Sequence, residues 1–298
     1  MLDVAPRRVL ARAADVSGCA IDTDHRGTAL RRVDVRAEVD DDGMFAAFHS
    51  TVDGSPEFVG RAAGKGFRAS LAPLTGAGPT ARLLRRLLWD LPISMQVAGQ
   101  TALLDHDAAR TEVVLSRRGT DQCSGWRADG EMMRQVDRNA AVLVMPLGPT
   151  TAEESIAEHW QPDLPALRPM ATRRSRVLSV GRSDARGRRP VTVRFRDSYA
   201  DPDGVSRALH EWTVRTELAG HGDDVRFAAF VAEPGRLPWV ECPIASTSAL
   251  RLSGRAPGGV EQAVGADFLG ISTCTHLNDT LRSLAGLPDL IAELDASA

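Results

Sequence analysis

Sulfur and imidazole groups gather in one short segment near the C-terminus, Ser272-Thr-Cys274-Thr-His276. The segment lies directly before, or in the first turn of, a helix expected over residues 275–286. A cysteine at a helix N-terminus meets unpaired backbone N–H groups and the positive end of the helix dipole, and both favour the thiolate. Cys274 is therefore a candidate nucleophile or metal ligand. The structural alternative is a buried Cys274 beside a His276 that hydrogen-bonds a carbonyl.

The spacing limits how Cys274 and His276 can act together. Residues two apart on a helix point about 200° apart, so the two side chains converge only if Cys274 still lies in extended chain before the helix. Suitable partners follow other predicted strands. Asp197 ends VTVRFRD, His210 opens HEWTVRTEL, and Cys242 follows LPWVE.

These residues suggest two kinds of chemistry. In the favoured interpretation His276 and His210 act as general acid and base, Asp197 orients one of them, and Cys274 is a nucleophile or lines the pocket. In the alternative, His210, Cys242, Cys274 and His276 form a Cys2His2 zinc site, although no CxxC or HxxxH spacing supports it. No other cofactor is predicted.

Further residues are expected to contact a substrate. If the two halves arose by duplication, Gly66-Phe67-Arg68 of the first half corresponds to Cys-Thr-His of the second. Phe67 is then a packing residue and Arg68 an anion clamp or an ion-pair partner, and an ordinary surface arginine is the alternative. Cys123 and Trp126 lie in a polar, glycine-marked loop, a common location for binding residues. The predicted substrate-binding residues are Arg68, Trp126, Tyr199 and Trp239.

The elements that would position these residues occur twice. Residues 33–48 and 212–230 both alternate in polarity, pass through a turn and end in Phe-Ala-Ala-Phe, which predicts two β-hairpins. Leucines at helical spacing predict helices over 80–92 and 275–286, and both run into Leu-Pro, a stop signal. We therefore expect an α+β fold of two related halves of antiparallel hairpins and helices. Internal duplication would explain the similarity, and chance similarity of short strands is the alternative.

Domain boundaries follow from proline. The expected division is an N-terminal half over 1–145, a proline-rich connector over 146–172 with a short helix near 152–160, and a C-terminal half over 173–298 that carries the Cys-Thr-His segment. The basic run that opens the third part, Arg173-Arg174-Ser175-Arg176, is interpreted as a solvated strand edge. The acidic run Asp40-Asp41-Asp42-Gly43 is interpreted as a hairpin turn rather than a cation site.

Composition excludes several classes of protein. Lys65 is the single lysine among 36 Lys+Arg, so a Schiff-base enzyme would depend on that residue. The run from Gly60 to Gly66 is one residue too short for a P-loop and lacks Ser/Thr after the lysine. A net charge of −3 with 5% aromatic residues gives no nucleic-acid footprint. The apolar runs are too short to span a bilayer and the N-terminus lacks a signal peptide, so we expect a cytoplasmic protein with four reduced thiols.

Residues 173–288 resemble the uncharacterised bacterial domain-of-unknown-function family numbered 2889. The similar features are the strand that ends in Asp197, the His210-led strand, the Cys242 segment and, most specifically, CTHLNDTLRSLAGL. In the first half GFRASL, LLWDLP and Cys123-Ser-Gly-Trp126 resemble the longer family members. Family members often have Thr and Lys after the acidic position, where this chain has Ser198-Tyr199. The resemblance implies a common fold and no accepted reaction.

The sequence therefore predicts a cofactor-independent enzyme that performs a lyase, isomerase or hydrolase step on a small organic metabolite, in a pocket between the two halves. Two alternatives stay open: a non-catalytic module that binds a small molecule or a partner, and a zinc-dependent hydrolase. Neither a nucleic-acid nor a membrane partner is expected. No heptad seam indicates an oligomeric state.

Overall fold

A computed structural model of the chain describes residues 1–7, 12–52, 58–64, 66–75, 78–101, 117, 119–138, 148–149 and 165–296. The strands are β1 (Leu2–Pro6), β2 (Ala14–Thr23), β3 (Ala29–Val39), β4 (Phe45–Ser50), β5 (Gly148–Pro149), β6 (Thr172–Val180), β7 (Arg189–Ala200), β8 (Ser206–Ala219) and β9 (Arg226–Pro234). The α-helices are α1 (Phe67–Thr75), α2 (Pro79–Trp89), α3 (Leu91–Thr101), α4 (Glu131–Asp137), α5 (Val260–Asp267), α6 (Thr275–Arg282) and α7 (Leu287–Ala296). Short 3-10 helices are η3 (Ser124–Trp126), η5 (Gly222–Asp224), η6 (Cys242–Leu252), η7 (Pro257–Gly259), η8 (Gly270–Ser272) and η9 (Ser283–Gly286).

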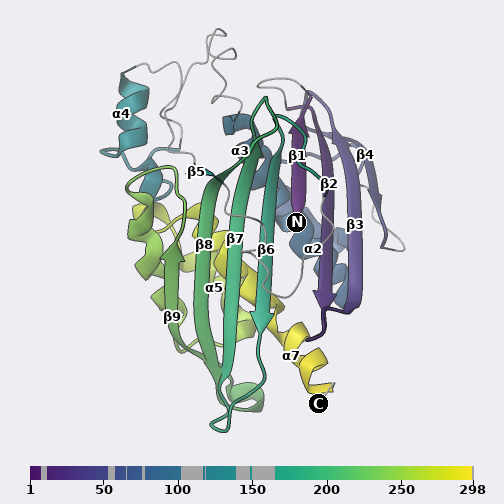
Figure 1. Cartoon of the computed structure of the whole chain (residues 1–298), viewed down its shortest axis with the longest axis vertical. Coiled ribbons are helices and arrows are strands. Elements are labelled where there is room, and N and C mark those ends of the chain that lie inside the picture. The colour runs from purple at the N-terminus through teal and green to yellow at the C-terminus, as the bar shows by residue number, and fades with distance from the viewer. Residues whose placement is uncertain are drawn as a thin grey trace. The chain divides into compact units, whose positions relative to one another are not determined.

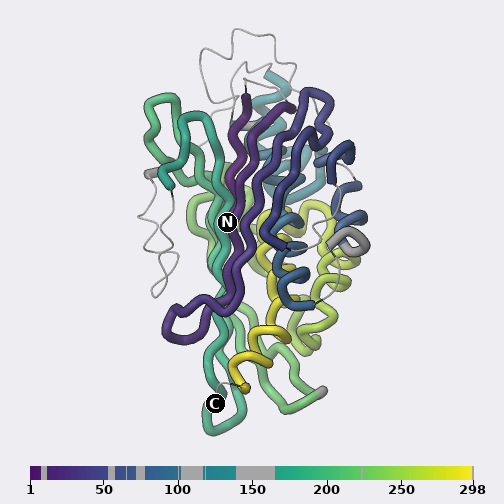
Figure 2. The backbone as a smooth tube through the Cα atoms, turned by 90° about the vertical axis from the view of Figure 1, so that its right-hand side faces the viewer, coloured from purple at the N-terminus to yellow at the C-terminus, as the bar shows by residue number. Residues whose placement is uncertain are grey.

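The described strands join in the order β4-β3-β2-β1-β6-β7-β8-β5, with β9 paired to β8. The pairs β1–β2, β2–β3, β3–β4, β1–β6 and β8–β9 are antiparallel. Long hairpins therefore dominate the strand layer, as Figures 1 and 2 show. This confirms the α+β class.

One turn motif, Asp-x-x-Gly-x, closes four of these hairpins. It begins at Asp24, Asp40, Asp184 and Asp201, and in each case the Asp Oδ1 accepts backbone N–H groups two and four residues ahead. The glycine three residues after each Asp has φ between +73° and +81°, a region that suits a residue without Cβ. The predicted turn at Asp40 to Gly43 is thereby confirmed, with Asp40 making the capping hydrogen bonds.

The two predicted hairpins are present as β3–β4 and β8–β9, and their registers match. Val39 faces Phe45 as Leu218 faces Phe227, and Arg36 faces His49 as Arg215 faces Val231. Each pairing contains an irregularity just before its turn. The matched register agrees with the sequence alignment of the two hairpins, and duplication of an ancestral half stays a prediction.

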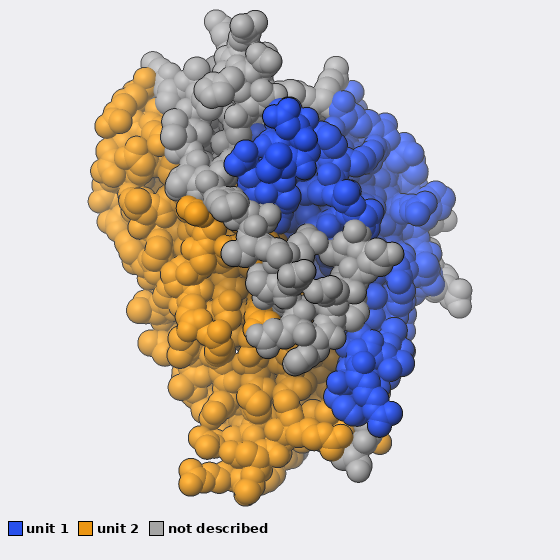
Figure 3. All heavy atoms as spheres, viewed as in Figure 1, with its two compact units in different colours: residues 1–111, 149–175, 197–207 blue, residues 112–148, 176–196, 208–298 orange. Residues whose placement is uncertain are grey.

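By its contacts the chain divides into two compact units that interleave along the sequence (Figure 3). Unit 1 comprises residues 1–111, 149–175 and 197–207, and unit 2 comprises 112–148, 176–196 and 208–298. The sequence-based boundaries (1–145, 146–172 and 173–298) instead follow the chain from end to end. Most of the predicted connector, including its expected helix near 152–160, lies outside the described residues.

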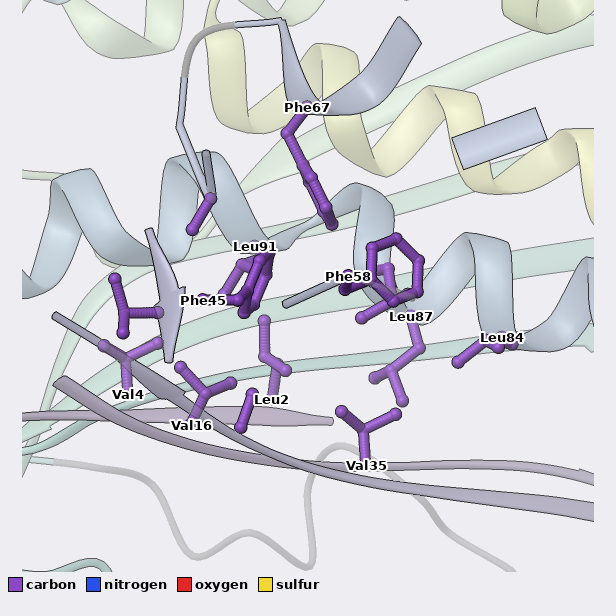
Figure 4. Close-up of a cluster of buried hydrophobic side chains, with 14 of the residues drawn as sticks. Leu2, Val4, Val16, Val35, Phe45, Phe58, Phe67, Leu84, Leu87 and Leu91 are labelled. Carbon is purple, nitrogen blue, oxygen red and sulfur yellow. The ribbon is translucent and has the colours of Figure 1, made fainter. Parts of the chain in front are cut away.

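The core of unit 1 lies between its strands and its helices (Figure 4). Helix α2 packs against β2 and β3, and α3 packs against β1, because leucines repeat at helical spacing on α2. Gly18 in β2 permits this contact. A Cβ there would lie 2.8 Å from Cδ1 of Leu2 and 3.3 Å from both Cδ atoms of Leu87. A larger residue would therefore force these leucines to move.

The Leu-Pro signals mark helix boundaries in both halves, as predicted. Helix α2 ends at Trp89 and α3 begins at Leu91-Pro92, whereas η9 ends at Gly286 and α7 begins at Leu287-Pro288. Proline lacks the backbone N–H but fits the first turn of a helix. Each Leu-Pro pair therefore both ends one helical segment and opens the next. None of the described helices combines the length and apolar character needed to cross a membrane.

Candidate functional site

Cys274 is the residue that precedes α6, and its backbone is extended, with φ −130° and ψ 132°. Helical geometry begins only at Thr275. The condition under which the two side chains can converge is therefore met, and Sγ of Cys274 lies 3.9 Å from Nδ1 of His276. The structure brings together two predicted site residues that a continuous helix would separate.

A buried hydrogen-bond network fixes this turn. The Thr273 hydroxyl donates to Oδ1 of Asn278 at 2.5 Å, and the Asn278 amide donates to the Phe268 carbonyl at 3.0 Å. The backbone N–H of Asn278 donates to the Cys274 carbonyl, the first hydrogen bond of α6. Thr273 and Asn278 are both buried. Cys274 thus enters the helix at a defined angle.

The Cys274 thiol is buried, with 3% of the residue exposed. Burial, with a smaller contribution from Cys123, raises its pKa to about 12. The backbone N–H groups of Leu277 and His276 and the indole N–H of Trp212 act in the opposite direction. The helix N-terminus therefore favours the thiolate, as predicted, but desolvation outweighs that effect while the thiol stands alone.

Two further buried thiols, Cys123 and Cys242, come from distant segments of unit 2. The Ser124 backbone N–H donates to the Thr273 carbonyl, and the Ser124 hydroxyl donates to the Cys242 carbonyl. These bonds hold the loop of Cys123 against the segments that carry Cys242 and Cys274. Burial is the main cause that raises the pKa of all three thiols.

His210 and His276 stack face to face. Their ring centroids lie 3.6 Å apart and the ring planes differ by 16°. His210 comes from β8 and is buried, whereas His276 is the second residue of α6 and is half-buried. Phe195 of β7 contacts the His276 ring with centroids 6.1 Å apart. The predicted acid–base pair is therefore in direct contact.

Asp197 belongs to unit 1, whereas His210 and His276 both belong to unit 2. The orienting role of Asp197 toward a histidine therefore stays a prediction.

Arg174 holds the Asp197 carboxylate. Its Nε donates to Oδ1 and its Nη2 donates to Oδ2, both at 2.8 Å. Arg174 is 2% exposed and Asp197 is also buried. A buried bidentate guanidinium keeps a carboxylate ionised and fixes its orientation.

The basic run at Arg173 and Arg174 is therefore not a solvated strand edge, and that interpretation is wrong. Arg173 is buried too and pairs with Asp3 through two hydrogen bonds of 2.8 Å. Thr172, Arg173 and Arg174 are consecutive buried residues of β6, so both faces of the strand are covered there. Alternation cannot signal such a strand.

The predicted substrate-binding residues lie in different places. Arg68 and Tyr199 belong to unit 1, where Arg68 donates to the Trp89 carbonyl and stacks over its indole, and the Tyr199 hydroxyl donates to the Met170 sulfur. These contacts give both side chains packing roles. Trp239 is buried in unit 2, and Trp126 belongs to η3, whose Gly125 lies against Trp239. Trp126 and Trp239 are therefore near the three thiols.

Two important side chains were missed from the sequence, Arg174 and Trp212. Arg174 was hidden in a basic run, and its partner Asp197 lies on a different strand. Trp212 follows His210 by two residues on β8, so alternation places both on one face of that strand. This spacing was the available signal for Trp212.

Comparisons with known proteins give one family-model match, in the second part of the chain. Residues 171–288 match the family model "Protein of unknown function (DUF2889)". This range includes Asp197, His210, Cys242, Cys274 and His276. A search of curated proteins and a search of solved structures each found no significant match.

Proposed function

We propose that this chain, whose residues 171–288 match the DUF2889 family model, is an enzyme that moves protons on a small organic substrate through the pair His210 and His276. The observation that carries the proposal is the stacked contact of the two rings, 3.6 Å between centroids. Imidazole is the side chain best suited to take up and return a proton near neutral pH. The reaction would be a lyase, isomerase or hydrolase step without a resident cofactor.

The stacking places two imidazole groups at one location. One ring is then available as a base while its neighbour can act as an acid. A pair of this kind supplies both halves of an acid–base step from one location.

The test uses the full chain and a panel of small keto acids, esters and thioesters in D2O. Proton NMR measures substrate turnover and the exchange of C–H protons for deuterium. His276→Gln and His210→Gln should each lower the rate by about 100- to 10,000-fold, whereas His25→Gln, in an exposed turn, serves as the matched control and should keep it. Equal rates in all four proteins would contradict the proposal and favour a non-catalytic binding module.

A further inference from the structure

Trp212 presents a buried donor to Cys274. The residue is 1% exposed, and its indole Nε1 has no hydrogen-bond partner at ordinary geometry in the described part of the chain. Its influence falls on Cys274, where the indole N–H lowers the pKa of the thiol. A buried unsatisfied N–H is costly. A neutral thiol accepts it poorly, whereas a thiolate would accept it well.

The backbone supplies two more donors to the same sulfur. The N–H groups of His276 and Leu277, in the first turn of α6, act on Cys274 in the same direction as Trp212. Their alignment with the helix axis adds the positive end of its dipole. Three donors are thus directed at one sulfur atom, and the proton acceptor His276 lies 3.9 Å away.

We infer that Cys274 is the nucleophile of this site, that His276 removes its proton, and that the substrate is a small activated acyl compound, an ester or a thioester. This inference rests on the proposed function, because it assigns a covalent step to the same histidine. It explains the orphaned indole N–H, which becomes satisfied when negative charge develops on the sulfur. It also explains why the segment before α6 is extended.

The step balances without an oxidant or reductant. Nδ1 of His276 takes the Sγ proton while Sγ forms a bond to the carbonyl carbon and the carbonyl electron pair moves to oxygen. The carbonyl then re-forms, the bond to the leaving group breaks, and His276 returns the proton to that group. His276 then takes a proton from a water molecule while the water oxygen bonds to the thioester carbon. The C–S bond breaks, and His276 returns the proton to Sγ, which releases the carboxylic acid and restores the thiol.

Burial of the thiol is compatible with this step. An isolated thiolate is disfavoured at this position because it would be a buried charge without a counterion. Transfer of the proton to His276 instead creates a thiolate–imidazolium pair with no change in net charge. The nucleophile forms together with its counterion, beside the three N–H donors.

The test is acetylation of the full chain by p-nitrophenyl acetate, with peptide mass spectrometry to locate the acetyl group. We expect a burst of p-nitrophenol and an acetyl group on Cys274. Cys274→Ser should abolish the acetylated peptide, and His276→Gln should slow its formation by about 100-fold or more. Trp212→Phe, which keeps an aromatic ring and removes the donor, should slow it by about 10- to 100-fold. Cys19→Ser is the control and should behave as the wild type.

Two results would overturn the inference: no acetyl group on Cys274 in the wild type, or equal rates of acetylation in the wild type, His276→Gln and Trp212→Phe. Neither result depends on Cys274→Ser, so both can be obtained even if that variant fails to fold. If Cys274 stays unmodified while turnover of the panel above still depends on His210 and His276, the covalent step is wrong and the proposed function stands. If acetylation of Cys274 depends on His276 but His210→Gln leaves substrate turnover unchanged, Cys274 stays assigned as the nucleophile. The proposal that His210 and His276 act as a pair is then wrong.

Discussion

The sulfur of Cys274 and Nδ1 of His276 lie 3.9 Å apart although the residues are two positions apart in the sequence. The contact exists because α6 begins between them. Cys274 is extended and His276 is helical, so the change of backbone conformation at Thr275 replaces the divergence of about 200° that a helix would impose. A shift of the helix start by one residue would separate the two groups.

Arg174 and Asp197 provide a prediction about stability. Arg174→Met should lower the free energy of unfolding by about 3–5 kcal/mol, because it leaves a buried carboxylate without its bidentate partner. Urea unfolding measures the loss. The double variant Arg174→Met/Asp197→Leu should recover much of it, since neither charge then remains buried.

The matched control for this pair is Arg32→Met, which breaks a similar contact on the surface. Arg32 donates to Asp34 at 2.7 Å, but 59% and 36% of the two side chains are exposed. An exposed pair contributes at most about 1 kcal/mol. If Arg32→Met and Arg174→Met lowered the free energy of unfolding equally, burial would not be the reason that the Arg174–Asp197 pair matters.

Sequence patterns predicted what is local in this fold. Hairpins, turns and helix ends depend on neighbouring residues, and the Asp40 turn, the two Phe-Ala-Ala-Phe hairpins and the Leu-Pro boundaries all follow from such patterns. The conditional geometry of Cys274 and His276 was also accessible, because it depended only on where one helix begins. These features need no knowledge of distant segments.

The remaining features depend on contacts between distant residues. Burial of Arg174 depends on the residues packed around β6, which a run of arginines does not indicate. The partners in the stack, His210 and His276, are separated by the whole of β9 and α5. Residue types identified them as candidates, but only the packed structure puts one ring on the other.

Asp184 provides a prediction about pH. The backbone N–H of Arg188 is the main cause that lowers its pKa below the ordinary value of 3.8, and that of Arg186 acts in the same direction. Because the folded pKa is depressed, the stabilisation is fully present above pH 3.8 and is lost as the pH falls through the folded value. The Tm of Asp184→Asn should therefore lie below that of the wild type at pH 5, and this difference in Tm should be smaller at pH 2. A difference in Tm that is the same at both pH values would show that the charge of Asp184 does not stabilise this turn.

Gly125 provides a prediction about packing beside the thiols. A Cβ at this position would lie 2.6 Å from Sγ of Cys242 and 3.0 Å from Cδ1 of Trp239. Gly125→Ala should therefore cost about 1–3 kcal/mol through overpacking, measured by urea unfolding. Gly258→Ala is the control, because no heavy atom lies within 4 Å of its added Cβ. If both variants lose the same free energy of unfolding, crowding against Cys242 and Trp239 is not the cause.

Asn278 provides a prediction that separates positioning from chemistry. Asn278→Leu removes the acceptor of the Thr273 hydroxyl and the donor to the Phe268 carbonyl, and both groups are left in a buried location. The expected cost is about 1–3 kcal/mol of stability. Because this network sets the angle at which Cys274 enters α6, acetylation of Cys274 by p-nitrophenyl acetate should also slow, under conditions where the variant is still fully folded.

The comparison that isolates this effect is Ser246→Ala, which removes an exposed hydroxyl whose hydrogen bond to the Pro243 carbonyl is local to η6. It should leave both stability and the acetylation rate near those of the wild type. Asn278→Leu protein that is destabilised but acetylated at the wild-type rate would show that the network supports the fold alone. Slower acetylation in the folded variant, with the same peptide modified, would instead show that the network sets the reactivity of Cys274, because Asn278 itself takes no part in the proposed bond changes.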